Sequence, residues 1–122
     1  MVKVICDTSF LIHIASTRIK NISNIDVEIG NIEYVIPSIV LKEIESLSKD
    51  EKKGKKAKST MAYIKNFKKI EISGTFADKA IMEHVKTNGG IVATMDKELK
   101  NKIKNQGGSI ISISNDRIIL EQ

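Results

Sequence analysis

The stretch VATMDKELKNKIK, residues 92–104, sets a short apolar run directly before Asp96 and a charged segment with helical spacing directly after it. This order is typical of a strand that ends in a polar corner and continues into a helix. Asp96 then has two interpretations: a helix N-cap, a position that favours aspartate, or a metal ligand with partners elsewhere in the chain. Because one residue can do both, the answer depends on what other strands place beside it.

The same alternation of apolar runs and helical segments recurs along the 122 residues. It is typical of an α/β fold with a central parallel sheet of four or five strands. We expect strands at residues 2–6, 34–36, 70–72, 91–94 and 110–113, and helices near residues 9–18, 38–48, 56–68, 76–88 and 97–105. Residues 20–32 fit a loop, a short helix or an edge strand. The length predicts a single domain over residues 1–122.

Asp7 ends the first expected strand as Asp96 ends the fourth. In a doubly wound sheet of order 3-2-1-4-5, ligands bind outside the carboxyl ends of the strands, at the point where the strand order reverses. Strands 1 and 4 are neighbours at that point. We therefore expect Asp7 and Asp96 to lie side by side, although Asp7 also has the simpler interpretation of a helix cap.

Two further acids are selected by their helical positions. Asp78 falls within the apolar arc that runs from Ile81 through Val85 to Met82, where a carboxylate is costly unless something pairs with it. Its alternative interpretation is a favourable place in the first turn of a helix. Glu43 flanks the apolar stripe of the helix expected at residues 38–48, and it fits a shared cleft or an ordinary helix surface equally well.

Convergence of these four acids would require a cation or bound protons, because two carboxylates about 4 Å apart repel by roughly 4 kcal/mol. Oxygen ligands suit Mg²⁺ or Mn²⁺ rather than zinc. Such an ion beside a basic surface points to chemistry on phosphodiesters. Thr8, Ser9 and Thr94 adjoin the two strand-end aspartates and either orient the metal site or act as local caps.

The charge balance favours contact with nucleic-acid backbone. Twenty basic residues against fifteen acidic ones give a net charge of +5, and residues 49–58 form an expected exposed link that is rich in lysine. Lysine attracts phosphate but reads base edges poorly, so this link either steers RNA or only keeps the chain solvated. With 4% aromatic residues, base stacking has little support. The candidate RNA-binding lysines are Lys52, Lys53, Lys55, Lys56 and Lys58.

Other features bear on location and alternative chemistry. No apolar run approaches the roughly 20 residues of a membrane span, and the one cysteine, Cys6, fits a reducing compartment, so we expect a cytoplasmic protein. His13 and His84 are weak candidates for a general base, since a metal-activated water needs none. A phosphate-binding receiver-like domain shares the α/β pattern but would need a glycine-rich phosphate loop, which the sequence lacks.

Four stretches together resemble a PIN-domain ribonuclease: CDTSFLI, IPSIVLKEIESL, ADKAI and GGIVATMDKELKNKIK, in this order. The resemblance implies a three-layer α/β/α sandwich and an endoribonuclease dependent on Mg²⁺ or Mn²⁺. Such an enzyme cleaves single-stranded RNA to leave a 5′-phosphate and a 3′-hydroxyl. It also implies roles for hydroxyl residues at Thr94 and at Thr8 or Ser9. The family's metal-binding acids correspond to Asp7, Glu43, Asp78 and Asp96.

Within the family, GKKAKSTMAYIK, ATMDKELKNKIK and IISISNDRIILEQ are similar to the archaeal and eukaryotic group that processes small-subunit rRNA. In size the chain is also similar to VapC-type toxins of toxin–antitoxin pairs. The resemblance implies single-stranded RNA such as an rRNA precursor as substrate, a ribosome-assembly protein or an antitoxin as partner, and a homodimer. A catalytically weak RNA-binding or assembly module stays a third alternative.

Overall fold

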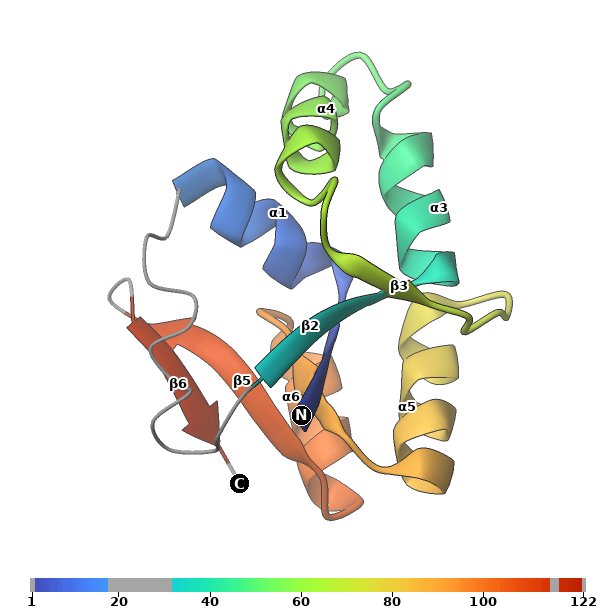
Figure 1. The fold of residues 1–122 in the computed structure, drawn as a ribbon, viewed down its shortest axis with the longest axis vertical. Helices are drawn as coiled ribbons and strands as arrows, with labels where there is room; N and C mark the ends of the chain where they lie inside the picture. Colours follow the sequence, from blue (N-terminus) through green and yellow to red (C-terminus); the bar gives the residue numbers. More distant parts are fainter. Residues whose placement is uncertain (1, 18–31, 115–116, 122) are drawn as a thin grey trace.

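The chain folds as strands and helices in alternation, as the apolar pattern predicts (Figure 1). A computed structural model describes residues 2–17, 32–114 and 117–121. Residues 20–31, whose structure the sequence left open, lie outside these ranges. The strands are β1 (Val2–Cys6), β2 (Ile32–Pro37), β3 (Lys68–Ile70), β4 (Ile91–Ala93), β5 (Ser109–Ser114) and β6 (Arg117–Glu121). The helices are α1 (Thr8–Thr17), α3 (Ser38–Leu47), α4 (Gly54–Tyr63), α5 (Ala77–Asn88) and α6 (Lys97–Asn105).

The sheet has the order β3-β2-β1-β4-β5-β6. The four pairings from β3 to β5 are parallel in the predicted order 3-2-1-4-5, whereas β6 is antiparallel to β5. The central strand β1 pairs on both sides, so that Ile5 lies opposite Val35 of β2 and Val92 of β4. The sixth strand exceeds the predicted four or five, because RIILE joins the sheet as a hairpin edge rather than as a parallel core strand.

Helices cover both faces of this sheet. In Figure 1, α1, α3 and α4 gather in the upper part of the molecule and contact one another, while α5 and α6 lie together below. The right-handedness of connections between parallel strands explains the two groups. The strand order runs from β1 outward to β3 on one side and from β1 outward to β5 on the other. The helices between β1 and β3 therefore lie on one face of the sheet, and those between β3 and β5 lie on the other. The predicted three-layer sandwich is confirmed. No described helix is long and apolar enough to cross a membrane.

Two expected elements have different bounds for physical reasons. Residue Ile72, expected in β3, is instead bound to the start of α3: its amide donates to the Ser38 hydroxyl at 3.1 Å, and its carbonyl accepts from the Ile39 amide at 3.1 Å. Helix α4 spans Gly54–Tyr63 rather than residues 56–68, so that its earlier start shortens the expected link at 49–58 and β3 begins at Lys68, within the expected helix. A Cβ on Gly54 would lie 2.7 Å from the Ser48 carbonyl oxygen, so glycine is needed for this close turn.

Edge strand β6 is held by Glu121. Its carboxylate accepts hydrogen bonds from Lys104 of α6 at 2.9 Å and from Ser112 of β5 at 2.6 Å, and it pairs with Lys100 at 2.9 Å. These hydrogen bonds, with that of Ser112 foremost, lower the pKa of Glu121 from 4.5 to about 2. The contacts join the antiparallel strand to both the sheet and the helix that covers it.

We expect Glu121→Gln to lower the free energy of unfolding by about 1 kcal/mol at neutral pH, since partly exposed ion pairs contribute little more. Because the folded-state pKa is depressed, the carboxylate's contribution is present above about pH 4.5 and is lost as the pH falls towards 2. Urea unfolding of wild type and variant at pH 7 and pH 2.5 measures both effects. An equal difference at the two pH values would contradict the ionic origin.

Candidate active site

The carboxyl ends of β1 and β4 meet at the reversal of strand order, as predicted. The Asp7 amide donates to the Ala93 carbonyl oxygen at 3.0 Å, which joins the two strands at their ends. Beside this junction lies a pocket of about 200 Å³, here called the acid pocket. All four acids selected from the sequence line it. Its lining consists of Asp7, Thr8, Ser9, Glu43, Ala77, Asp78 and Asp96.

Asp7 is buried, with 5% of its surface exposed, and its carboxylate is held by three donors. Oδ1 accepts from the Ser9 hydroxyl at 2.8 Å and from the Phe10 amide at 2.9 Å, and Oδ2 accepts from the Thr94 hydroxyl. The bond to Phe10 is the predicted helix cap. A carboxylate has about four acceptor positions, so one position on Oδ2 is left for another ligand.

Ser9 and Thr94 connect the two strand-end aspartates. Each hydroxyl directs its proton to Asp7 and accepts an amide at 3.0 Å: that of Met95 for Ser9, and that of Asp96 for Thr94. Their mutual contact at 3.3 Å is therefore not a hydrogen bond while Asp7 is ionised, because neither hydroxyl has a second proton to donate. The predicted supporting role of Ser9 and Thr94 thus has a definite geometry.

The other three acids reach the acid pocket from three helices. Asp96 caps α6, its Oδ1 accepting the Glu98 amide at 2.9 Å and that of Leu99 at 3.3 Å. Glu43 comes from α3 and Asp78 from the first turn of α5. Asp78 is exposed, although the helical pattern placed it on a buried face. Asp78 lies in the first turn of α5, whereas Ile81 and Val85, further along the same face, are buried.

The surroundings of Asp7 and Asp78, including the charges of neighbouring acids, raise the pKa of both residues. Burial raises the pKa of Asp7 from 3.8 to about 6, against the lowering effect of its hydrogen bonds, and the charge of Asp78 adds to the rise. The pKa of Asp78 is also raised, first by partial desolvation and then by the charges of Asp96 and Glu43. Neighbouring carboxylates that raise the pKa of Asp7 and of Asp78 form a site that attracts cations.

The arrangement has counterparts in known proteins. The PIN like domain family matches residues 4–116. The chain belongs to this family. It is 39% identical over 113 residues to Ribonuclease VapC4 of Methanocaldococcus jannaschii, covering 84% of this chain and 83% of that protein.

Two solved structures resemble this one. One is that of the PIN domain endonuclease Utp24, with a TM-score of 0.82 and 27% identity over 98% of this chain and 90% of that one. The other is PAE2754 from Pyrobaculum aerophilum, with a TM-score of 0.63 and 21% identity over 89% of this chain and 83% of that one. At that identity PAE2754 supports the fold alone.

Further features of this PIN domain bear on whether the acid pocket fits a metal ion. The Thr8 hydroxyl oxygen is buried in the pocket lining and has no hydrogen-bond partner among the described residues. Within the same ranges, no three acidic, histidine or cysteine side chains lie close enough to form a ready-made metal cage. The pocket therefore fits a divalent cation held by one or two carboxylates with waters, the usual arrangement for Mg²⁺.

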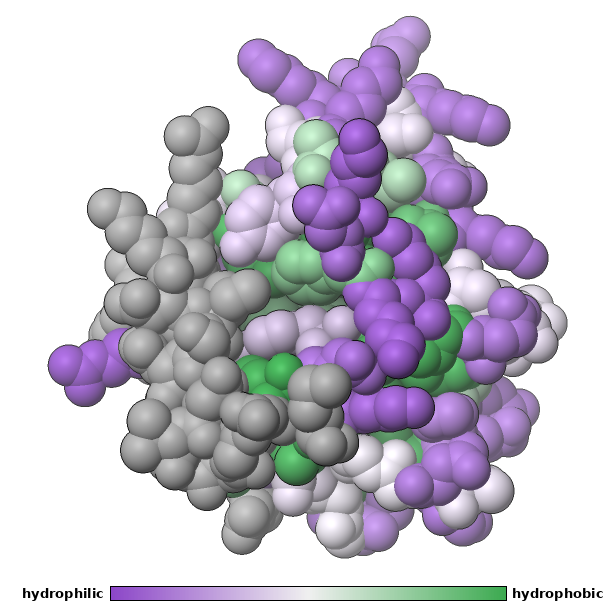
Figure 2. Space-filling model, viewed as in Figure 1, coloured by the Kyte–Doolittle hydropathy of each residue, from purple (hydrophilic) through white to green (hydrophobic). Residues whose placement is uncertain are grey.

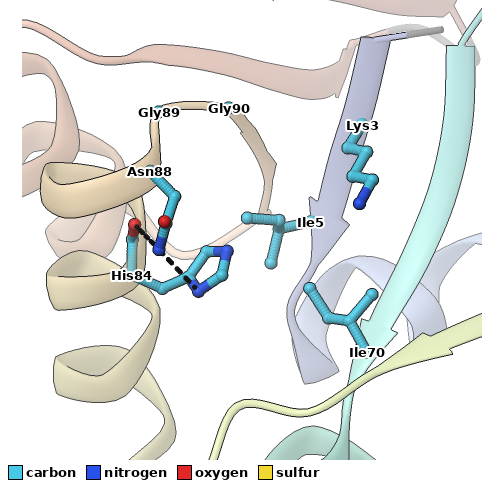
Figure 3. Close-up of a pocket in the computed structure, with 7 residues that line it drawn as sticks. All are labelled: Lys3, Ile5, Ile70, His84, Asn88, Gly89 and Gly90. Carbon is cyan, nitrogen blue, oxygen red and sulfur yellow. Dashed lines mark hydrogen bonds between the residues drawn. The ribbon is translucent and has the colours of Figure 1, made fainter.

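A larger pocket, of about 420 Å³, lies between α5 and the sheet and contains none of the four acids (Figure 3). His84 points into it, with its Nδ1 3.4 Å from the side-chain nitrogen of Asn88. His84 therefore lines a different pocket, and neither it nor His13 lines the acid pocket. The small residue Ala77 does line the acid pocket, a role for which the sequence offers no signal.

The lysines of the α3–α4 connection are exposed, as predicted. Figure 2 shows hydrophilic side chains projecting from the end of the molecule where these two helices connect. None of the five candidate lysines forms an ion pair with another described residue. Glu43 lies four residues before the end of α3, ~6 Å along the helix axis, and the chain leads from that end to the lysine cluster. The cluster consists of Lys52, Lys53, Lys55, Lys56 and Lys58.

Proposed function

We propose that this PIN-family protein is an endoribonuclease that hydrolyses phosphodiester bonds of single-stranded RNA at the acid pocket with Mg²⁺ or Mn²⁺. The observation that carries the proposal is the convergence of four carboxylates, from β1's end and three helices, on one pocket. The 39% identity to a protein named a ribonuclease supports the reaction class. The excess of basic residues favours a polyanionic substrate.

The residues of the acid pocket have different roles in the proposed reaction. Asp7, held by Ser9 and Thr94, and the capping Asp96 are the best-oriented ligands for an ion, with Asp78 and Glu43 completing the negative field. When bound, Mg²⁺ or Mn²⁺ lowers the pKa of water and offsets the charge of the phosphodiester. The unpartnered Thr8 hydroxyl is available to bind a water or a phosphate oxygen.

The direct test is incubation of the purified protein with a labelled single-stranded RNA and Mn²⁺. We expect cleavage within the strand that stops on addition of EDTA, with a 5′-phosphate and a 3′-hydroxyl on the products. Digestion of the products by an exonuclease specific for 5′-phosphates identifies the ends. Cleavage that persists in EDTA, or products with a 2′,3′-cyclic phosphate, would exclude the proposed metal-dependent hydrolysis.

The lysine cluster contributes a surface for RNA backbone. We expect Lys55→Ser with Lys58→Ser to weaken RNA binding and to flatten the slope of log affinity against log salt by about 1.4, since each phosphate contact on a single strand contributes ~0.7. Fluorescence anisotropy at several salt concentrations measures the slope.

The matched control is Lys3→Ser with Lys86→Ser, which removes the same charge from exposed positions outside the cluster and the acid pocket. We expect this control to change the slope less than the cluster variant does. Equal slopes for the two double variants would assign the effect to net charge rather than to a binding surface.

The identity of the RNA that is cleaved distinguishes a role in rRNA processing from a role as a toxin. Sequencing of 5′-phosphate ends after digestion of total cellular RNA distinguishes them: one site in an rRNA precursor supports processing with a ribosome-assembly partner. Sites in tRNA, mRNA or mature rRNA support a toxin with an antitoxin partner. Salt-dependent binding without turnover would instead support the assembly-module alternative. A cytoplasmic location and a homodimer stay predictions.

A further inference from the structure

Phe76 differs from the other aromatic residues of the chain. The sequence holds three Phe and two Tyr residues and no Trp. Four of these five form one connected set of ring contacts: Phe10 with Tyr34, Tyr34 with Phe67, and Phe67 with Tyr63. Phe76 is outside this set and is 71% exposed, the most exposed large apolar residue in the described part of the chain.

Phe76 lies next to the acid pocket in the chain, so its exposed ring is available to RNA bound there. Phe76 is the residue before α5, and the two residues after it, Ala77 and Asp78, line the acid pocket. Phe76 itself lines another hollow, of about 350 Å³, which the loop before α5 and the first turns of α5 form. The aromatic ring thus stands two residues from a pocket carboxylate.

The hollow combines groups suited to one nucleotide. Phe76, Lys79 and Glu83 line it from α5 and its N-terminus, with Gly74 and Thr75 of the preceding loop beside them. Phe76 offers a flat apolar face, and Lys79 offers a cation for a phosphate. Glu83, seven residues after Phe76, repels phosphate, so the favourable place for the backbone is the Lys79 side.

We propose that Phe76 is a stacking platform for a base next to the scissile phosphate of single-stranded RNA, with Lys79 contacting the flanking backbone. This inference rests on the proposed function, because it takes the acid pocket as the place of cleavage. A base in a duplex already stacks on its neighbours and is not free for Phe76. The platform therefore selects unpaired RNA, and it gives base stacking a support that the low aromatic content of the sequence does not.

The test measures RNA binding separately from cleavage, by anisotropy in EDTA with the Asp96→Asn protein. In that background, we expect Phe76→Ala to lower affinity for a single-stranded RNA by ~5- to 150-fold, the range for loss of one base–aromatic stack. Phe76→Trp should retain affinity, and Phe76→Leu should lose it. Because the side chain is exposed, the unfolding temperature should stay unchanged.

Two matched controls make the result specific. Ile119→Ala truncates the other exposed large apolar residue, on β6, and should leave affinity unchanged. The same RNA annealed to its complement should bind the Phe76→Ala variant and its parent equally. In cleavage assays with intact acids, Phe76→Ala should raise KM with little change in kcat.

The outcomes separate this inference from the proposed function. Unchanged affinity in Phe76→Ala, or equal losses for Trp and Leu variants, overturns the stacking role even where the wild type cleaves RNA. Absence of binding to single-stranded RNA also overturns it. Conversely, an aromatic-dependent loss of affinity in a protein that shows no cleavage supports base stacking on Phe76 but overturns the proposed function, and with it the place of that base next to a scissile phosphate.

Discussion

Replacing Asp96 by asparagine is expected to lower the rate of RNA cleavage by at least ~100-fold, the upper range for loss of residues that only support a metal ligand. Asparagine caps helices about as well as aspartate, so α6 should keep its first turn, where Asp96 accepts the Glu98 and Leu99 amides. The change thus removes a charge from the acid pocket and leaves the fold unchanged. Single-turnover cleavage with Mn²⁺ measures the rate.

Asp50→Asn is the matched control for this experiment. Asp50 also accepts two successive backbone amides, those of Lys52 and Lys53, but it lies in the α3–α4 connection and not in the acid pocket. We expect it to cleave RNA at close to the wild-type rate. A nuclease activity that survives Asp96→Asn unchanged would mean that the chemistry takes place elsewhere or in a contaminant.

Asp7→Asn is expected to abolish cleavage and yet to stabilise the metal-free protein by about 2 kcal/mol at pH 8. Burial raises the pKa of Asp7 from 3.8 to about 6, so its ionised form is disfavoured in the folded state. A shift of this size corresponds to about 3 kcal/mol, less what the asparagine amide loses among donors arranged for a carboxylate. Urea unfolding in EDTA measures the difference.

The pH dependence follows from the sign of the shift. Because the folded-state pKa is raised, the native state takes up its proton first as the pH falls, and the wild type regains stability between about pH 6 and pH 4. The advantage of Asp7→Asn should therefore be full above pH 7 and absent below about pH 4. A constant difference across this range would show that charge burial is not its cause.

The stabilisation of the same variants by divalent ions is a second test of the acid pocket. An ion that binds only the folded state raises stability by RT ln(1 + [ion]/Kd). Millimolar Mn²⁺ should therefore raise the unfolding temperature of wild type and Asp50→Asn but change that of Asp7→Asn much less. Equal stabilisation of all three by Mn²⁺ would place the ion outside the acid pocket.

Local pattern was sufficient to predict the order of the sheet and the meeting of Asp7 with Asp96. Strand-forming runs before each aspartate, together with the handedness of parallel crossovers, leave few other arrangements. The capping roles of both residues were also predictable, because N-caps depend on neighbours within three residues. Asp78 and Glu43 were selected by helical face, and the structure brings both to the acid pocket.

Contacts between distant residues were decided only by the tertiary structure. The pairing of β6, the binding of Ile72 to Ser38, and the Ser9–Thr94 bridge to Asp7 join residues whose separation no periodic pattern reports. The exposure of Phe76 is of the same kind, since an apolar residue at a helix start is buried or exposed according to what packs over it. Sequence thus determined which groups the strand ends carry, and packing determined their hydrogen bonds, their pKa values and the surface beside them.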